Sequence, residues 1–178
     1  MGFRIAAAVS AFALTTGWVS MAAPAREVTV ACSTAPALPA HLSDWTRTVR
    51  GKTFYGYGEA RAEDWPPLGA ARTSLALHRF ESLRYAVGPA RAANPFRFGG
   101  MVPVVVDRPG RLVIALSEAA WIDVVRDGSF VTSVAHGHGP ACSGIRKMIE
   151  FDVTPGRYLL QISGASSASI DAMAVLRN

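Results

Sequence analysis

The second half of the chain is a series of short hydrophobic runs separated by turn residues. Each run is rich in valine, isoleucine, leucine or aromatic side chains, and turn residues recur about every 8 to 12 positions. No stretch after residue 73 keeps apolar residues at the helical spacing i, i+3, i+4, i+7 over three turns. The pattern predicts an all-β fold, a single jelly-roll-like antiparallel β-sandwich over residues 74–178. The runs are SLALH, LRYAV, GGMVPVVV, RLVIAL, WIDVV, SFVTSV, MIEFDV, RYLLQIS and SIDAMAVL.

Two turns can be assigned from their residue types. Asp127-Gly128 separates two apolar runs and predicts a two-residue hairpin, because both central positions of a type I′ turn need positive φ. The Asp-Arg-Pro-Gly segment at residues 107–110 suits a tight turn with proline at its second position.

The chain also contains two similar segments, here called the internal echo. RPGRLVIALSEAAWID, which begins at Arg108, resembles TPGRYLLQISGASSASID, which begins at Thr154. Two such units could occupy related positions in two facing sheets. Alternatively, Pro-Gly turns before strands are simply common, and two copies are too few for a repeat protein.

The strand WIDVV raises a question of orientation. Alternation places Trp121 and Asp123 on one face, and Ile122 and Val124 on the other. If the Trp121 face is core, which is the commoner arrangement, Asp123 is a buried carboxylate that needs a partner. If that face is exposed, Trp121 is a candidate platform for a sugar ring. The partner of Asp123 would be Arg146, Lys147 or a calcium ion.

The first residues have the layout of a secretory signal peptide. One cation, Arg4, precedes an uncharged apolar run, and small residues follow it, with cleavage expected after Ala22 or Ala25. The run is shorter than the roughly 20 residues that a membrane span needs, and no later segment is long and apolar enough. We therefore expect a signal peptide at residues 1–25 and a periplasmic or secreted protein. Residues 26–73 read as a Pro/Ala-rich lead-in and an irregular, aromatic-containing segment with at most one short strand.

The charge of the chain indicates a mildly basic surface. The formal net charge is +5, and all but two of the 18 cations are arginines scattered along the sequence. A nucleic-acid-binding protein would concentrate its cations on one stripe and interleave aromatic residues. We expect no nucleic-acid partner.

The number of cysteines predicts one disulfide. Cys32 and Cys142 are the two cysteines of the chain, and an exported protein meets an oxidising compartment. Cysteines held in such a bond cannot act as thiolate ligands or nucleophiles.

The segment SVAHGHGPACSGIRK, residues 133–147, holds the best metal-ligand candidates. His136 and His138 are two residues apart, so on a strand both imidazoles point to one face and could bind Zn, Cu or Fe. A metal site needs a third ligand, for which the sequence offers candidates but no placement. The alternative is a glycine-rich loop anchored by the Cys142 disulfide, with histidines that contact solvent or backbone. The possible third ligands are His41, His78, Asp123 and Asp127.

The region from Gly100 to Val175 resembles the bacterial pre-peptidase C-terminal domain. The likeness rests on RLVIAL after a Pro-Gly turn, the WIDVV strand, an Asp-Gly hairpin and the closing FDVTPGRYLLQISG. Domains of that family are jelly-roll-like β-sandwiches that accompany secreted enzymes and often bind polymers or calcium. The resemblance implies the same fold and a binding role.

The block AWIDVVRDG…SVAHGHGPACSGIRK also resembles a group of small exported proteobacterial proteins, some of which are labelled homogentisate 1,2-dioxygenase. That dioxygenase is a much larger cytoplasmic cupin enzyme whose iron is held by two histidines and a glutamate. No stretch of this chain aligns with that triad, so the residues do not support the label.

These features predict an exported, non-catalytic binding or structural protein of the cell envelope, with a polysaccharide or protein ligand. No catalytic residue is assigned, because PACSG around Ser143 is not the G-x-S-x-G motif of a nucleophile elbow. Trp121, Asp123, Arg146 and Lys147 are the candidate ligand-binding residues. The alternative is a small metal-dependent oxidoreductase that uses His136 and His138.

Overall fold

The computed structural model describes residues 32, 36–55, 66–91, 94 and 97–177. The expected signal peptide, residues 1–25, lies outside the described residues. From residue 32 onward the chain forms one compact unit. No helix among the described residues is long and apolar enough to cross a membrane.

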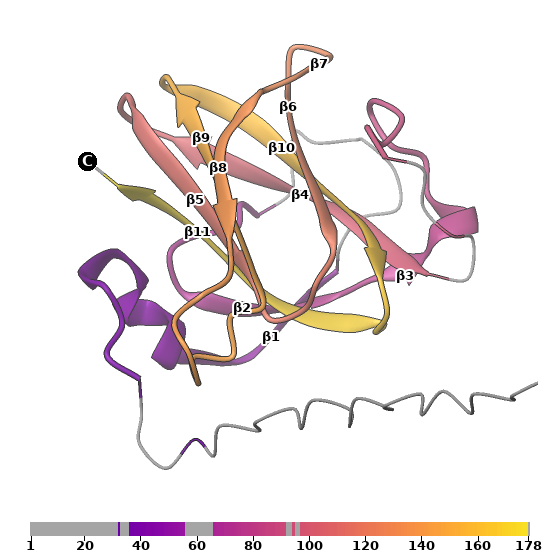
Figure 1. Cartoon of the computed structure of the whole chain (residues 1–178). Coiled ribbons are helices and arrows are strands. Elements are labelled where there is room, and N and C mark those ends of the chain that lie inside the picture. Colours follow the sequence, from indigo (N-terminus) through magenta and orange to yellow (C-terminus); the bar gives the residue numbers. More distant parts are fainter. Residues whose placement is uncertain (1–31, 33–35, 56–65, 92–93, 95–96, 178) are drawn as a thin grey trace, which may run out of the picture. The chain divides into compact units, whose positions relative to one another are not determined.

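The described chain forms two β-sheets, which confirms the predicted all-β sandwich (Figure 1). All strand pairs are antiparallel except β1 with β2. The six-stranded sheet has the order β1 (Thr48–Tyr55), β2 (Arg72–Ala76), β11 (Ser169–Arg177), β5 (Gly110–Leu116), β9 (Lys147–Val153) and β8 (Ser133–Gly137). The five-stranded sheet has the order β3 (His78–Arg79), β4 (Phe98–Val106), β10 (Gly156–Ala165), β6 (Trp121–Arg126) and β7 (Ser129–Phe130). The sandwich therefore begins before residue 74, because β1 belongs to the six-stranded sheet.

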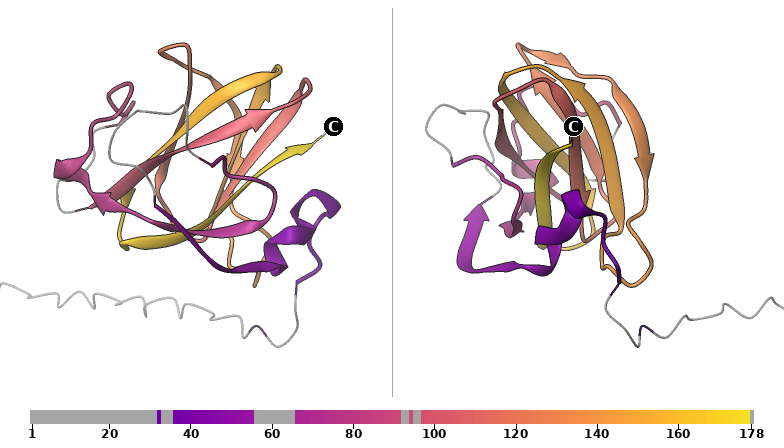
Figure 2. Two further views of the ribbon diagram at one scale, coloured as in Figure 1. Left: turned by 180° about the vertical axis from the view of Figure 1, so that it is seen from behind. Right: turned by 90° about the vertical axis from the view of Figure 1, so that its left-hand side faces the viewer.

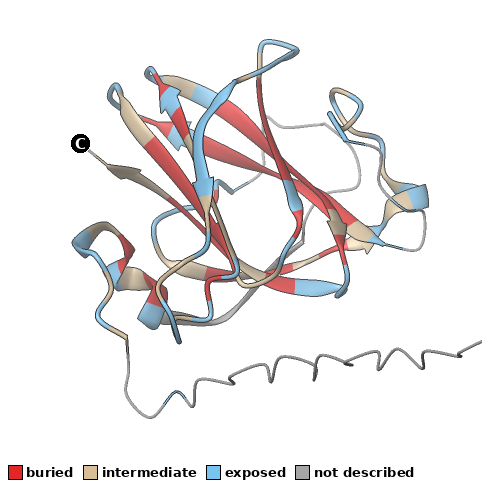
Figure 3. Cartoon of the chain, in the orientation of Figure 1, coloured by how far each residue is buried: buried red, intermediate tan, exposed pale blue. Residues whose placement is uncertain are grey.

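The main core lies between the two sheets. Leu112, Ile114 and Leu116 of β5 belong to it, as do Leu160 and Ile162 of β10. Each of these side chains is at most 2 % exposed, and Figure 3 shows the buried residues concentrated along the strands. Burial of this apolar surface is the main stabilising term of the fold.

The outer faces of both sheets are also covered in part, which explains why β5 and β10 read as continuous apolar runs. The 3-10 helix η1 (Ala40–Thr46) places Leu42 and Trp45 on Val113, Ala115 and Met173 of the six-stranded sheet. Figures 1 and 2 show η1 beside the end of β11. The other sheet is covered by residues 83–90, here called the strap, which follows the short 3-10 helix η2 (Phe80–Ser82).

Both predicted turns and the internal echo have a place in the structure. Asp127 and Gly128 have φ values of 50° and 73°, as the type I′ hairpin between β6 and β7 requires. Residues 107–110 connect β4 to β5. The first copy of the echo runs from β5 in the six-stranded sheet to β6 in the five-stranded sheet, and the second runs from β10 to β11 in the opposite direction. The two copies therefore occupy related positions in facing sheets.

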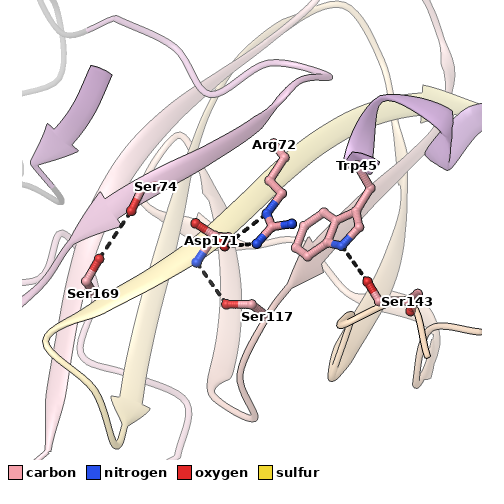
Figure 4. A network of polar contacts seen from close by, with 7 residues as sticks. All are labelled: Trp45, Arg72, Ser74, Ser117, Ser143, Ser169 and Asp171. Atoms are coloured by element: carbon pink, nitrogen blue, oxygen red, sulfur yellow. Dashed lines mark hydrogen bonds and ion pairs between the residues drawn. The ribbon is translucent and has the colours of Figure 1, made fainter. Parts of the chain in front are cut away.

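The predicted disulfide is present, and it holds a loop of the six-stranded sheet. Cys32 and Cys142 are bonded, with their Cα atoms 5.5 Å apart and 110 residues between them in sequence. Beside the bond, Trp45 Nε1 donates to the carbonyl oxygen of Ser143 at 2.9 Å (Figure 4). Arg72 lies 5.2 Å from the centre of the Trp45 ring and donates to Asp171 Oδ2 of β11 at 2.5 Å. The loop 138–146 is thus joined covalently to Cys32, by a hydrogen bond to Trp45 of η1, and by the hydrogen bond from the Arg146 N–H to the carbonyl oxygen of Leu116 in β5.

Removal of the disulfide is expected to lower stability without changing the fold. A Cys32→Ala/Cys142→Ala variant should lose about 4 kcal/mol of unfolding free energy, because the unfolded chain is no longer closed into a long loop. Guanidinium titration followed by circular dichroism measures this loss. A reducing agent should destabilise the wild type to the same extent and leave the variant unaffected. An equal free energy for oxidised wild type and variant would contradict the expectation.

Candidate functional site

The predicted ligand-binding residues gather at one end of the sandwich, around a pocket of about 570 Å³. This pocket, here called the basic pocket, is lined by Trp121 of β6, by Arg146 and Lys147 at the start of β9, and by Ser163 of β10. Arg91, Asn94 and Arg97 form a further part of its wall. Segments that are distant in sequence therefore meet here, which the sequence alone does not indicate.

The floor of the basic pocket belongs to the outer face of the five-stranded sheet. Trp121 pairs with Ser163, and Asp123 pairs with Gln161, in the antiparallel register of β6 and β10. Directly opposed residues in such a pair point to the same side of the sheet. Of the two orientations that the sequence left open, the structure has the exposed one, because the Trp121 side chain is 37 % exposed at the surface. Ile122 and Val124 face the core between the sheets instead.

The strap covers this face as far as Asp123 and ends before Trp121. Gln161 Nε2 donates to the carbonyl oxygen of Val87 at 2.9 Å, and its Oε1 accepts from the Val87 N–H at 3.2 Å. The Tyr85 hydroxyl donates to the carbonyl oxygen of Ile162 at 2.7 Å. Burial, with a further effect of Asp123, raises the pKa of Tyr85 well above its ordinary value. Gly99 permits this contact, because a Cβ there would lie 2.3 Å from the Tyr85 hydroxyl.

Asp123 is buried although its face of the sheet is not the core, and its partners are different from those expected. Its Oδ1 accepts from Trp121 Nε1 at 2.9 Å, and its Oδ2 accepts from the Ala90 N–H at 3.1 Å. Neither Arg146 nor Lys147 forms a hydrogen bond or ion pair with this carboxylate, whose two oxygens each accept one hydrogen bond from other described residues. Asp123 thus orients the Trp121 ring and fixes the end of the strap.

Four cations that form no salt bridge with a described residue line the basic pocket, whereas Arg79 and Arg84, which also form none, lie outside it. Arg91, Arg97, Arg146 and Lys147 make no salt bridge with any described residue. The Arg91 guanidinium lies 5.7 Å from the centre of the Trp121 ring, a cation–π distance. Elsewhere on the described surface six arginines are paired with carboxylates: Arg47, Arg72, Arg108, Arg111, Arg126 and Arg177. A cleft lined by one sign of charge attracts ligands of the opposite sign.

A buried hydroxyl without a partner lines the same pocket. Ser163 is 2 % exposed, and its Oγ has no hydrogen-bond partner among the described residues. A buried polar group without a partner costs about 1 to 3 kcal/mol, so native proteins rarely leave one without a function. Its position beside the cations marks a place where a ligand atom can be hydrogen-bonded.

Among the described residues, His136 and His138 line different pockets and do not form a metal site with a third ligand. His136 is at the end of β8 and lines a second pocket between the sheets, whereas His138 lines the basic pocket. His138 Nδ1 lies 2.7 Å from the carbonyl oxygen of Arg146, so this nitrogen donates its hydrogen there. The described residues contain no group of three histidine, cysteine or acidic side chains that could hold a metal ion.

The turn between β10 and β11 is held by Glu118. Ser166, which lines the basic pocket, donates both its N–H and its hydroxyl to Glu118 Oε1. Partial burial raises the pKa of Glu118, but the hydrogen bonds from Ser166 and Ser167 outweigh this effect and leave the pKa below its ordinary value of 4.5. The carboxylate form of Glu118 therefore stabilises this wall of the pocket.

In comparisons with protein-family models, curated proteins and solved structures, nothing matches this chain. The two resemblances stated from the sequence motifs stay predictions. Sequence reasoning missed Arg91, Arg97, Gln161 and Ser163, although two arginines in PARAANPFRF, a stretch without acidic residues, were a usable signal.

Glu118→Gln is expected to destabilise the protein at neutral pH and not in acid. A group with a lowered folded pKa stabilises the fold above its unfolded pKa and loses that effect as pH falls through the folded value. The variant should be less stable at pH 7 by under about 1 kcal/mol, since the site is largely solvated. Thermal unfolding between pH 7 and pH 3 measures the difference, which should shrink below pH 4.5. Glu81→Gln on η2 is the control, and a difference independent of pH would contradict the assignment.

Proposed function

We propose that this chain is an exported, non-catalytic binding protein of the periplasm or the extracellular space, and that its ligand is anionic. The signal-peptide pattern of the first residues supports export, and the Cys32–Cys142 bond is compatible with an oxidising compartment. The ligand is bound in the basic pocket, at the end of the sandwich.

One observation supports the anionic ligand: four cations that form no ion pair with a described residue line the same pocket as Ser163, whose buried hydroxyl has no partner among the described residues. Like charges held close together repel one another, and bound negative charge relieves that repulsion. Arginine presents a planar fork of donors that fits a carboxylate, sulfate or phosphate group, and Ser163 adds one neutral donor.

The position of Trp121 favours a ligand from the cell envelope, either an acidic polysaccharide or an acidic protein segment. Its indole is partly exposed and held in place by the Asp123 hydrogen bond at 2.9 Å. A rigid, accessible aromatic face offers stacking surface to a sugar ring or to an apolar side chain. The negative groups of either ligand would contact the surrounding cations.

A binding role fits these residues better than catalysis. The Ser163 hydroxyl has no base within hydrogen-bonding distance among the described residues, so nothing there activates it as a nucleophile. A metal ion at His138 would be close to Arg146 and Lys147, whose charges repel it. For this reason we favour the binding protein over a metal-dependent oxidoreductase.

Neutralising the pocket is expected to weaken binding of anionic polymers. The Arg146→Ala/Lys147→Ala variant should bind alginate or poly-L-glutamate at least about tenfold more weakly than the wild type, because two charge-assisted contacts are lost. Calorimetric titration of the purified mature protein at two salt concentrations measures this, with neutral dextran as the polymer control. Stronger binding to alginate or to polyglutamate indicates which polymer class fits.

The matched control is Arg47→Ala/Arg108→Ala, which removes the same net charge from exposed arginines outside the pocket. This variant should bind as the wild type does. The proposal is wrong if neither polymer binds, or if both double variants weaken binding equally, which would indicate attraction to net charge alone.

A further inference from the structure

A second pocket, here called the slot, adjoins the basic pocket and opens between the two sheets. Its volume is about 350 Å³. Its apolar lining comes from core positions, with Ile122 3 %, Ile149 8 % and Phe151 1 % exposed. Val131 completes this apolar surface. The polar residues of the lining are Ser133 and His136 of β8, Lys147, and Asp123, whose carboxylate accepts hydrogen bonds from Trp121 and Ala90.

The slot exists because the two sheets are not closed at this side. The chain leaves the five-stranded sheet after β7 and enters the six-stranded sheet at β8. Strand β7 pairs with β6 only at Val125 and Arg126, and β8 pairs with β9. Beside Ile122, therefore, no strand of the described chain pairs with β6 on this side.

The slot and the basic pocket share two residues. Trp121 and Lys147 line both, so an apolar chamber and a cationic chamber meet at the same indole and the same ammonium group. Their volumes of about 570 and 350 Å³ lie within the range of roughly 300–1,000 Å³ typical of small-molecule sites. An apolar chamber open to solvent favours an apolar group over water.

We propose that the ligand is an amphiphilic anion, whose acidic group binds in the basic pocket and whose acyl or aryl group enters the slot. This inference rests on the proposed function, because the basic pocket supplies the site for the charged group. The shared chemistry is one acidic head next to one apolar body. Two classes of compound have this chemistry: carboxylic acids with a straight acyl chain and aromatic carboxylic acids.

A chain-length series tests the slot on the purified mature protein. Across acetate, butyrate, hexanoate and octanoate, affinity should rise about tenfold for every two carbons, because each buried methylene adds a nearly constant increment. 1-Octanol, which lacks the head, and acetate, which lacks the tail, should both bind far more weakly than octanoate. 2-Naphthoate represents the aromatic acids. Whichever of octanoate and 2-naphthoate binds more tightly shows whether the slot prefers an acyl chain or an aromatic ring.

Ser133→Trp is the variant that fills the slot from an exposed position on β8. It should remove the rise in affinity from acetate to octanoate and leave the affinity for alginate or polyglutamate unchanged. Val134→Trp is the matched control, since Val134 is 45 % exposed on the same strand and does not line the slot. Circular dichroism and thermal unfolding verify that both variants fold.

The outcomes separate the two proposals. If the acidic polymers bind and the series from acetate to octanoate is flat, the slot proposal is overturned and the proposed function stands. If Val134→Trp weakens octanoate binding as much as Ser133→Trp does, the slot proposal is also overturned. If neither acidic polymer binds, the proposed function fails, whatever the result of the series from acetate to octanoate.

Discussion

The attachment of the loop 138–146 to the rest of the sandwich is the constraint on which the candidate site depends. This loop supplies His138 and Arg146 to the basic pocket and leads directly into Lys147. The Cys142 disulfide, the 2.9 Å hydrogen bond from Trp45 to Ser143 and the burial of Ile145 against Trp45 hold it. Without these contacts, two neighbouring cations on a glycine-rich segment would separate in solvent, because like charges repel.

The opposite wall depends on the strap, which is held on the sheet largely by side-chain hydrogen bonds. Gln161 and Asp123 provide the hydrogen bonds that a neighbouring strand would supply, and they do so only as far as Ala90. Beyond Ala90, the next pair on the same face of the sheet, Trp121 and Ser163, is not covered by the strap. The pocket is therefore the uncovered end of a face that is otherwise packed.

The two chambers of the site follow from different features of the fold. The basic pocket forms on the outer face of one sheet, where the strap ends and the turn held by Glu118 begins. The slot forms between the sheets, where the crossing from β7 to β8 leaves a gap beside Ile122. Trp121 is at the junction, and its indole hydrogen bond to Asp123 fixes the orientation of the wall that both chambers share.

The sequence by itself determined most of the strands, the type I′ turn at Asp127-Gly128 and the single disulfide, because alternation, turn chemistry and cysteine number are local or countable properties. It did not show that LRYAV forms part of the strap, or that SFVTSV is divided between β7 and β8 in different sheets. It also marked Trp121, Asp123, Arg146 and Lys147, yet it left open whether Trp121 faces the core or the solvent, since alternation shows which residues share a face and not which face is inside. Only the tertiary structure decided that scattered cations meet at one pocket with Ser163. Such a meeting depends on how distant strands pair and where a covering segment ends, and neither has a signal in the local pattern.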